Sequence, residues 1–113
     1  MAGKKVVYLS DLMPGVKFPR NKLQGVYQVG CAKTPLGLLE AYRYKNYVII
    51  TLDGFVMGKE MFSDWAIENA YRYLKNFYDK EFVWRYLRML SWAISENTCF
   101  DYRSFEYNVY SLD

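Results

Sequence analysis

The pattern of apolar and polar positions divides this chain into a strand-rich first half and a helical second half. Up to about residue 57 the apolar runs are short, rich in β-branched and aromatic residues, and interrupted by turn residues, which is typical of β-strands. The clearest pair covers residues 36–44 and 47–52, joined by the two-residue loop Lys45-Asn46, in which Asn can adopt a positive φ. The same reasoning predicts shorter strands at residues 4–9, 16–18, 26–29 and 55–57, a basic loop at 19–25 and a turn region at 30–35.

The second half follows the helical period. A first helix is predicted at about residues 59–78 and a second at about 80–96, with Asp79 as the N-cap of the second. The apolar stripe of the first helix consists of Phe62, Ala66, Ala70, Tyr73, Leu74 and Phe77. That of the second consists of Phe82, Val83, Tyr86, Leu87, Leu90, Ala93 and Ile94. Strict alternation near the C-terminus then predicts a half-buried strand at about residues 104–110.

These elements predict an α+β fold. A small antiparallel sheet or half-open barrel, formed by about residues 4–57 plus the C-terminal strand 104–110, packs against the two helices. With 113 residues and a mass of 13.5 kDa, the chain has the length of one domain, covering residues 1–113. A chain of this mass buries roughly two thirds of its surface on folding, so it can close a core without a metal or a disulfide.

The composition argues against most enzymes. The chain contains no histidine, which removes the commonest general base and the commonest zinc ligand. It contains neither a phosphate-binding glycine loop nor a CxxC pair. We therefore expect no catalytic residue, no cofactor-binding residue and no metal site.

The two cysteines, Cys31 and Cys99, lie far apart in the chain. We expect both to be free packing residues, so that a reductant leaves the fold unchanged; a disulfide between them is the alternative. A catalytic thiol is disfavoured because no histidine is present to activate it. No apolar run is long enough to span a membrane, and the N-terminus does not resemble a signal peptide. We therefore expect a cytoplasmic protein that does not contact membranes.

One face of the predicted second helix departs from an ordinary solvated surface. Trp84, Arg88 and Trp92 follow one another at i,i+4 spacing, with Arg85 beside them, opposite the apolar stripe. Trp and Arg are enriched in the energetic centres of protein interfaces, so this face is our candidate partner-binding site, including contact with a second copy of the chain. Two alternatives stay open: both indoles belong to a core between two layers, or they stack on nucleic-acid bases.

The charge is distributed unevenly. Residues 1–45 carry eight basic and two acidic side chains, whereas the rest of the chain is net acidic. A basic half favours an anionic partner. The candidate nucleic-acid contacts are Lys17, Arg20, Lys22, Arg43 and Lys45. Tyr42, Tyr44 and Tyr47 lie among them, and we expect these rings to pack within the sheet rather than to stack on bases.

The sequence therefore predicts a small, non-enzymatic protein-binding module that acts as an inhibitor or adaptor by occupying a surface of a larger protein. Compact chains without catalytic motifs are common among accessory proteins of phages and mobile elements, which favours that origin. The alternative function is a nucleic-acid-binding domain that uses the basic N-terminal half.

Overall fold

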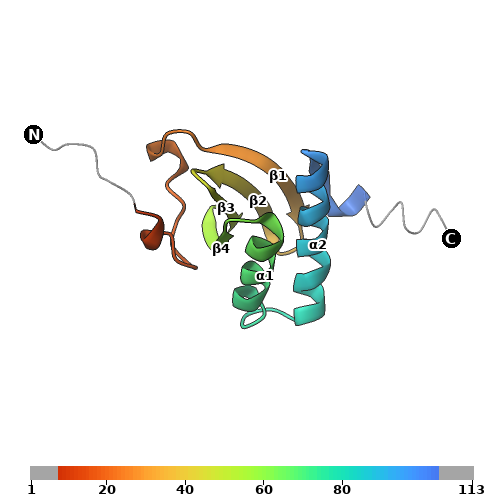
Figure 1. The fold of residues 1–113 in the computed structure, drawn as a ribbon. Coiled ribbons are helices and arrows are strands. Elements are labelled where there is room, and N and C mark those ends of the chain that lie inside the picture. Colours follow the sequence, from red (N-terminus) through yellow and green to blue (C-terminus); the bar gives the residue numbers. More distant parts are fainter. Residues whose placement is uncertain (1–7, 105–113) are drawn as a thin grey trace, which may run out of the picture.

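Five strands form one mixed sheet in the computed structural model, which describes residues 8–104 (Figure 1). The strand order is β4-β3-β2-β1-β5, and two helices lie side by side on one face of the sheet. The strands are β1 (Tyr27–Thr34), β2 (Gly37–Tyr44), β3 (Tyr47–Leu52), β4 (Phe55–Glu60) and β5 (Cys99–Asp101). The helices are α1 (Ser63–Leu74) and α2 (Lys80–Glu96). Two short 3-10 turns, Leu9–Asp11 and Arg20–Lys22, precede β1. The predicted α+β class is confirmed.

The two central turns are both present, but only the second has the backbone that its sequence predicts. β2 and β3 are antiparallel, with Tyr44 opposite Tyr47 at the end of the hairpin. The positive φ of this turn lies on Lys45, at 55°, and not on the asparagine that we expected to adopt it. At the next turn, Asp53 and Gly54 have φ values of 51° and 89°, the combination that a tight two-residue hairpin requires.

β1 is longer than the predicted strand at residues 26–29. It continues through residues 30–34, which we had expected to form a turn region, after a bulge between Gln28 and Gly30. Gly30 is present because α2 packs closely against it, and an added Cβ would lie 2.9 Å from the backbone nitrogen of Ile94. The glycine therefore allows close packing and does not end the strand.

α2 coincides with its predicted range. The Asp79 side chain accepts a hydrogen bond from the backbone N–H of Phe82 at 3.0 Å, as expected of an N-cap. α1 is shorter than the predicted helix at 59–78. It begins later because residues 59 and 60 remain in β4, where Glu60 pairs with Val48 of β3. It ends earlier because the Asn76 side chain donates to two carbonyl groups of its last turn.

The outer face of the sheet, away from the helices, is covered by the N-terminal segment. Leu12 and Phe18 are buried against Tyr42, Ile49 and Val56, forming a second hydrophobic cluster. The segment also hydrogen-bonds to Val56 of the edge strand β4 and to Gly54 in the turn before it, next to an isolated bridge between Lys17 and Phe55. The strand predicted at 4–9 is not present at residues 8 and 9, and residues 4–7 lie outside the described part of the chain.

The C-terminal strand joins the sheet earlier than predicted. β5 pairs with β1 in parallel, with Cys99 opposite Cys31, so the sheet is mixed and not purely antiparallel. The two cysteines form a disulfide, and our prediction of free thiols is therefore wrong. The parallel register brings their Cα atoms to 4.4 Å, a proximity that no local pattern in the sequence reveals. Ser104, the first residue of the strand predicted at 104–110, is helical and not extended, and residues 105–110 lie outside the described part of the chain.

Candidate protein-binding surface

All three tryptophans of the chain lie on the outer side of the helical layer. Trp65 of α1 is 55% exposed, and Trp84 and Trp92 of α2 are 42% and 54% exposed. Tryptophan is highly buried on average in folded proteins, so three exposed indoles on one layer are unusual. The alternative in which Trp84 and Trp92 are core residues is wrong for the described structure.

The helical period of α2 explains why these side chains point outward. Val83, Leu87 and Leu90 face the sheet and are fully buried. Because residues at i,i+4 share one face of a helix, the opposite face carries the predicted contact residues. Trp84, Arg85, Arg88 and Trp92 are all exposed there. The structure therefore brings the four predicted partner-binding residues together on one accessible surface.

Neighbouring aromatic rings support the two indoles of α2. Trp84 makes an edge-to-face contact with Tyr71 of α1, at a centroid distance of 5.3 Å. Trp92 contacts Phe100 of β5 in a similar way, at 5.7 Å. Each contact restricts an indole from one side and leaves another side accessible. Supported aromatic side chains of this kind lose less conformational entropy on binding than freely rotating ones.

Trp65 is a candidate contact residue that the sequence analysis missed. It packs against Phe62 at 5.0 Å and lines a shallow cleft of about 250 Å³ together with Glu60, Glu68, Asn69 and Arg72. The sequence contains a signal that Trp65 points outward. Trp65 lies three residues before Glu68 and seven before Arg72, which places it on the polar side of the helix with them.

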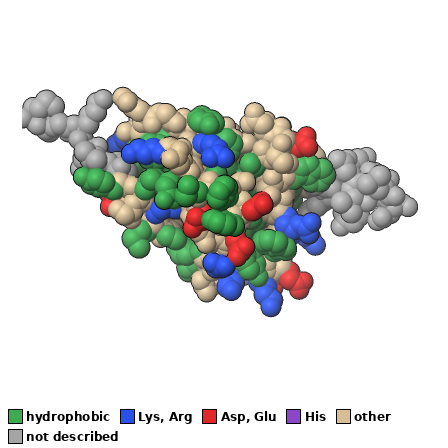
Figure 2. Space-filling view, viewed as in Figure 1, with side chains coloured by type: hydrophobic (Ala, Val, Ile, Leu, Met, Phe, Trp, Pro, Cys, Tyr) green, Lys and Arg blue, Asp and Glu red, His purple; other side chains and the backbone are tan. Residues whose placement is uncertain are grey.

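The two arginines of α2 have no acidic partner among the described residues. Arg72 is ion-paired with Glu68, and Arg103 with Asp101 at 2.9 Å. Neither Arg85 nor Arg88 makes an ion pair or a hydrogen bond with any residue between 8 and 104. Figure 2 shows hydrophobic side chains interspersed with charged ones on the side of the molecule seen in Figure 1. We name the outward side chains of α1 and α2, with Trp65, Trp84, Arg85, Arg88 and Trp92 among them, the helical face.

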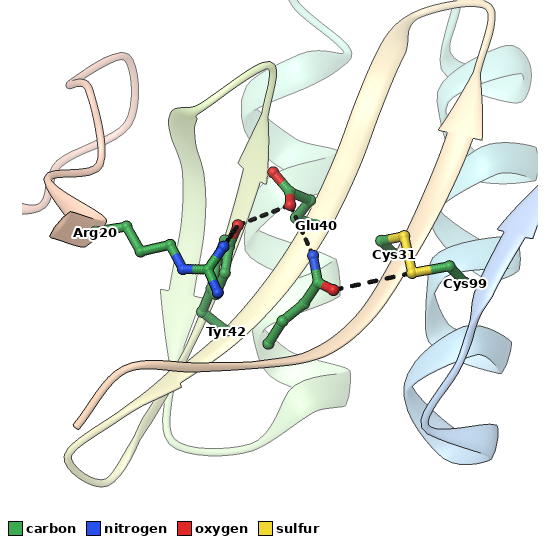
Figure 3. The surroundings of a disulfide bond; sticks show 6 residues. Arg20, Cys31, Glu40, Tyr42 and Cys99 are labelled. Atoms are coloured by element: carbon green, nitrogen blue, oxygen red, sulfur yellow. Dashed lines mark hydrogen bonds between the residues drawn. A yellow bond between two sulfur atoms is a disulfide. The ribbon is translucent and has the colours of Figure 1, made fainter.

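A polar row crosses the outer face of the sheet (Figure 3). Arg20 donates to the hydroxyl oxygen of Tyr42 at 3.3 Å, and that hydroxyl donates to Glu40 at 2.7 Å. The side-chain amide of Gln28 also donates to Glu40 at 2.7 Å, and its carbonyl oxygen lies 3.9 Å from the disulfide sulfur of Cys99. Burial, followed by the hydrogen bond to Glu40, raises the pKa of Tyr42 to about 12.

The five candidate nucleic-acid contacts are not gathered on one surface. Arg20 and Lys45 lie over the rings of Tyr42 and Tyr44, at 4.8 and 5.4 Å from the ring centroids. Arg43 is between these tyrosines in β2, so its side chain points to the opposite face of the sheet. Lys17 forms the bridge to β4, and Lys22 ends the second 3-10 turn.

Two of the three tyrosines of the central hairpin pack within the sheet, and the third, Tyr47, is partly exposed. Tyr42 and Tyr44 are only 4% and 6% exposed, beneath the N-terminal segment. Base stacking requires an accessible ring face. The described structure therefore leaves these two rings unavailable for stacking on nucleic-acid bases.

Among residues 8–104 there is no cluster of three or more acidic, histidine or cysteine side chains that could hold a metal ion. No helix in the same range is long and apolar enough to cross a membrane. Comparison with known proteins found no matching family, no similar curated protein and no similar solved structure. Proposals about function therefore rest on the chain's own chemistry.

Proposed function

We propose that this chain is a small, non-enzymatic protein-binding module that acts as an inhibitor or adaptor by occupying a surface of a larger protein through its helical face. The observation that supports this proposal most strongly is the outward position of all three tryptophans, with Arg85 and Arg88 among them. Trp and Arg contribute disproportionately to binding energy when a partner excludes water from them. An origin among phage or mobile-element accessory proteins remains part of the proposal.

The chemistry of the side chains supports a binding role without catalysis. The chain has no histidine, and both of its cysteines are joined in the disulfide, so neither supplies a thiolate nucleophile. Tyr42 has a raised pKa and is covered by Phe18 and Arg20. It is therefore a poor general base at neutral pH.

The disulfide bears on the compartment. The cytoplasmic location predicted from the sequence assumed free thiols, whereas disulfides persist mainly in oxidising compartments. We propose that the module works where this disulfide is maintained. Alkylation of free thiols in intact native cells, followed by mass spectrometry of the two cysteines, tests this: alkylated Cys31 and Cys99 would indicate a reducing compartment.

Substitution of Arg88 tests the binding proposal. Proteins from the native source that bind the immobilised chain are identified, and the strongest is purified and titrated with the wild-type chain and with Arg88→Ala. We expect this variant to weaken binding by about 2 kcal/mol, roughly thirtyfold, because Arg88 is at the centre of the helical face. The free energy of unfolding should change by less than about 0.5 kcal/mol, since Arg88 is exposed.

Lys22→Ala is the matched control, because it removes an exposed positive charge on the opposite side of the sheet. Equal affinities for wild-type and Arg88→Ala chains would contradict the proposal. Nucleic-acid binding would give a different result. Replacing Lys17, Arg20 and Lys22 with Glu would then abolish binding and reduce the salt dependence by about three phosphate contacts.

A further inference from the structure

The helical face carries exposed aromatic side chains from both helices. Trp65 belongs to α1, Trp84 and Trp92 belong to α2, and the contact between Tyr71 and Trp84 joins the two helices. Large apolar patches are uncommon on monomeric proteins and usually mark an interaction site. The charges around the indoles then indicate which occupant would complement this surface.

The charges on the two helices are complementary to each other. The outward side of α2 carries Arg85 and Arg88 without acidic partners. On α1 the exposed Asp64 makes no ion pair within residues 8–104, whereas Glu68 is ion-paired with Arg72 of the same helix and offers a second carboxylate that the two arginines would share. An occupant that covers the indoles also removes water from the arginines between them. Burying a charge without a partner is costly, so the occupant must supply carboxylates at Arg88. A second copy of the chain supplies them on its α1.

The positions of these residues along the helix axes fit a symmetric dimer. α1 and α2 run side by side in opposite directions (Figure 1). The ring contact between Tyr71 and Trp84 aligns these two residues across the helix pair. Because both helices rise equally per residue, Arg88 is level with the stretch between Asp64 and Glu68. A two-fold axis along the boundary between the helices would place α1 of one copy over α2 of the other. Arg88 would then meet the two carboxylates of the second copy, and symmetry would repeat the contact.

The area of the helical face indicates how strongly a second copy would bind. α2 has 17 residues and α1 has 12, so with a width of about 10 Å each the two helices cover roughly 450 Å². A standard stable interface buries about 800 Å² per partner. An interface below the standard size belongs to the weak, transient class, so the second copy should bind weakly.

We propose that two copies of this chain associate through the helical face, with Arg88 of each copy paired with Asp64 and Glu68 of the other. This inference rests on the proposed function, because it names the occupant of the same surface when no larger partner is bound. The larger partner would have to displace the second copy. If the chain is monomeric, the inference fails, while the proposed function is judged separately by the affinity of the Arg88→Ala chain for its larger partner.

Sedimentation equilibrium between about 5 and 500 µM tests the dimer directly. The wild-type chain should dimerise, and Arg88→Glu and Asp64→Arg should each raise the dissociation constant at least about tenfold, because each brings like charges together. Mixing the two variants should restore association. The glutamate introduced at position 88 of one copy then meets the arginine introduced at position 64 of the other, and the remaining contact pairs Arg88 with Asp64. Lys22→Glu is the control for net charge and should dimerise as the wild type does.

Circular dichroism and thermal unfolding of each variant establish that the substitutions leave the fold intact. A wild-type chain that is monomeric at the highest concentration would overturn the inference. So would a dimer that Arg88→Glu and Asp64→Arg both leave unchanged, because its interface would lie elsewhere. Failure of the mixture to associate would show that Arg88 and Asp64 do not pair.

Discussion

Tyr42 is a polar residue that forms part of the core. Its ring packs against Phe18 at a centroid distance of 5.2 Å, and its hydroxyl group lies between Arg20 and Glu40. Because the hydroxyl donates to a carboxylate, ionisation would remove that hydrogen bond and place two negative charges together. The neutral phenol is therefore the form that the fold stabilises.

The raised pKa of Tyr42 predicts a loss of stability at alkaline pH. The pKa is about 12 in the folded chain and 10.0 for an unperturbed tyrosine. The folded state therefore holds this proton more tightly, and the resulting stabilisation is complete below pH 10 and is lost as the pH rises towards 12. Urea unfolding over this interval should show a steeper fall in the free energy of unfolding for the wild type than for Tyr42→Phe. Equal slopes would mean that the phenol of Tyr42 titrates normally.

At the scale of elements, the disulfide fixes the short strand β5 to the rest of the sheet. β5 has three residues and, within residues 8–104, pairs only with β1. The bond closes a loop with a sequence separation of 68, which reduces the entropy of the unfolded chain. We therefore expect reduction, or the double substitution Cys31→Ser and Cys99→Ser, to lower the free energy of unfolding by about 4 kcal/mol.

Chemical unfolding with and without reductant measures this loss. Reductant should leave the double variant unchanged, which controls for effects elsewhere in the chain. An unchanged stability of the reduced wild type would agree with the independence from reductant that the sequence analysis predicted, and it would contradict the bond.

The elements that the sequence predicted well are those with local signals. The Asp79 cap and a continuous apolar stripe define α2, and the Asp53-Gly54 pair defines the turn between β3 and β4. The errors arise from contacts between distant segments. We predicted Gly30 as a turn residue because the sequence does not reveal that α2 packs against it. We predicted Cys31 as a packing residue because the sequence does not reveal that β5 pairs with β1. Both contacts depend on tertiary packing, which no local sequence pattern indicates.

At the scale of the whole molecule, the described residues form three layers with different exposure. The N-terminal segment covers one face of the sheet and the helices cover the other, so both faces of β2 and β3 are buried. No described segment covers the helices. The sequence predicted which residues form the outward face of α2. It could not predict that this face is exposed, because exposure depends on whether another layer packs against it. Trp65 belongs to the same surface because α1 packs beside α2, which the sequence does not reveal.

This layering predicts that tryptophan fluorescence reports on the helical face alone. All three indoles are about half exposed there, so at low micromolar protein concentration acrylamide should quench the folded chain with a slope below that of the unfolded chain but well above that of buried indoles. Raising the protein concentration into the range where two copies associate should lower the slope, because the second copy covers the same indoles. Arg88→Glu should keep the high slope at every concentration. A folded chain whose indoles resist quenching even when dilute would show that the tryptophans are covered within one copy, and both the binding surface and the dimer would then be wrong.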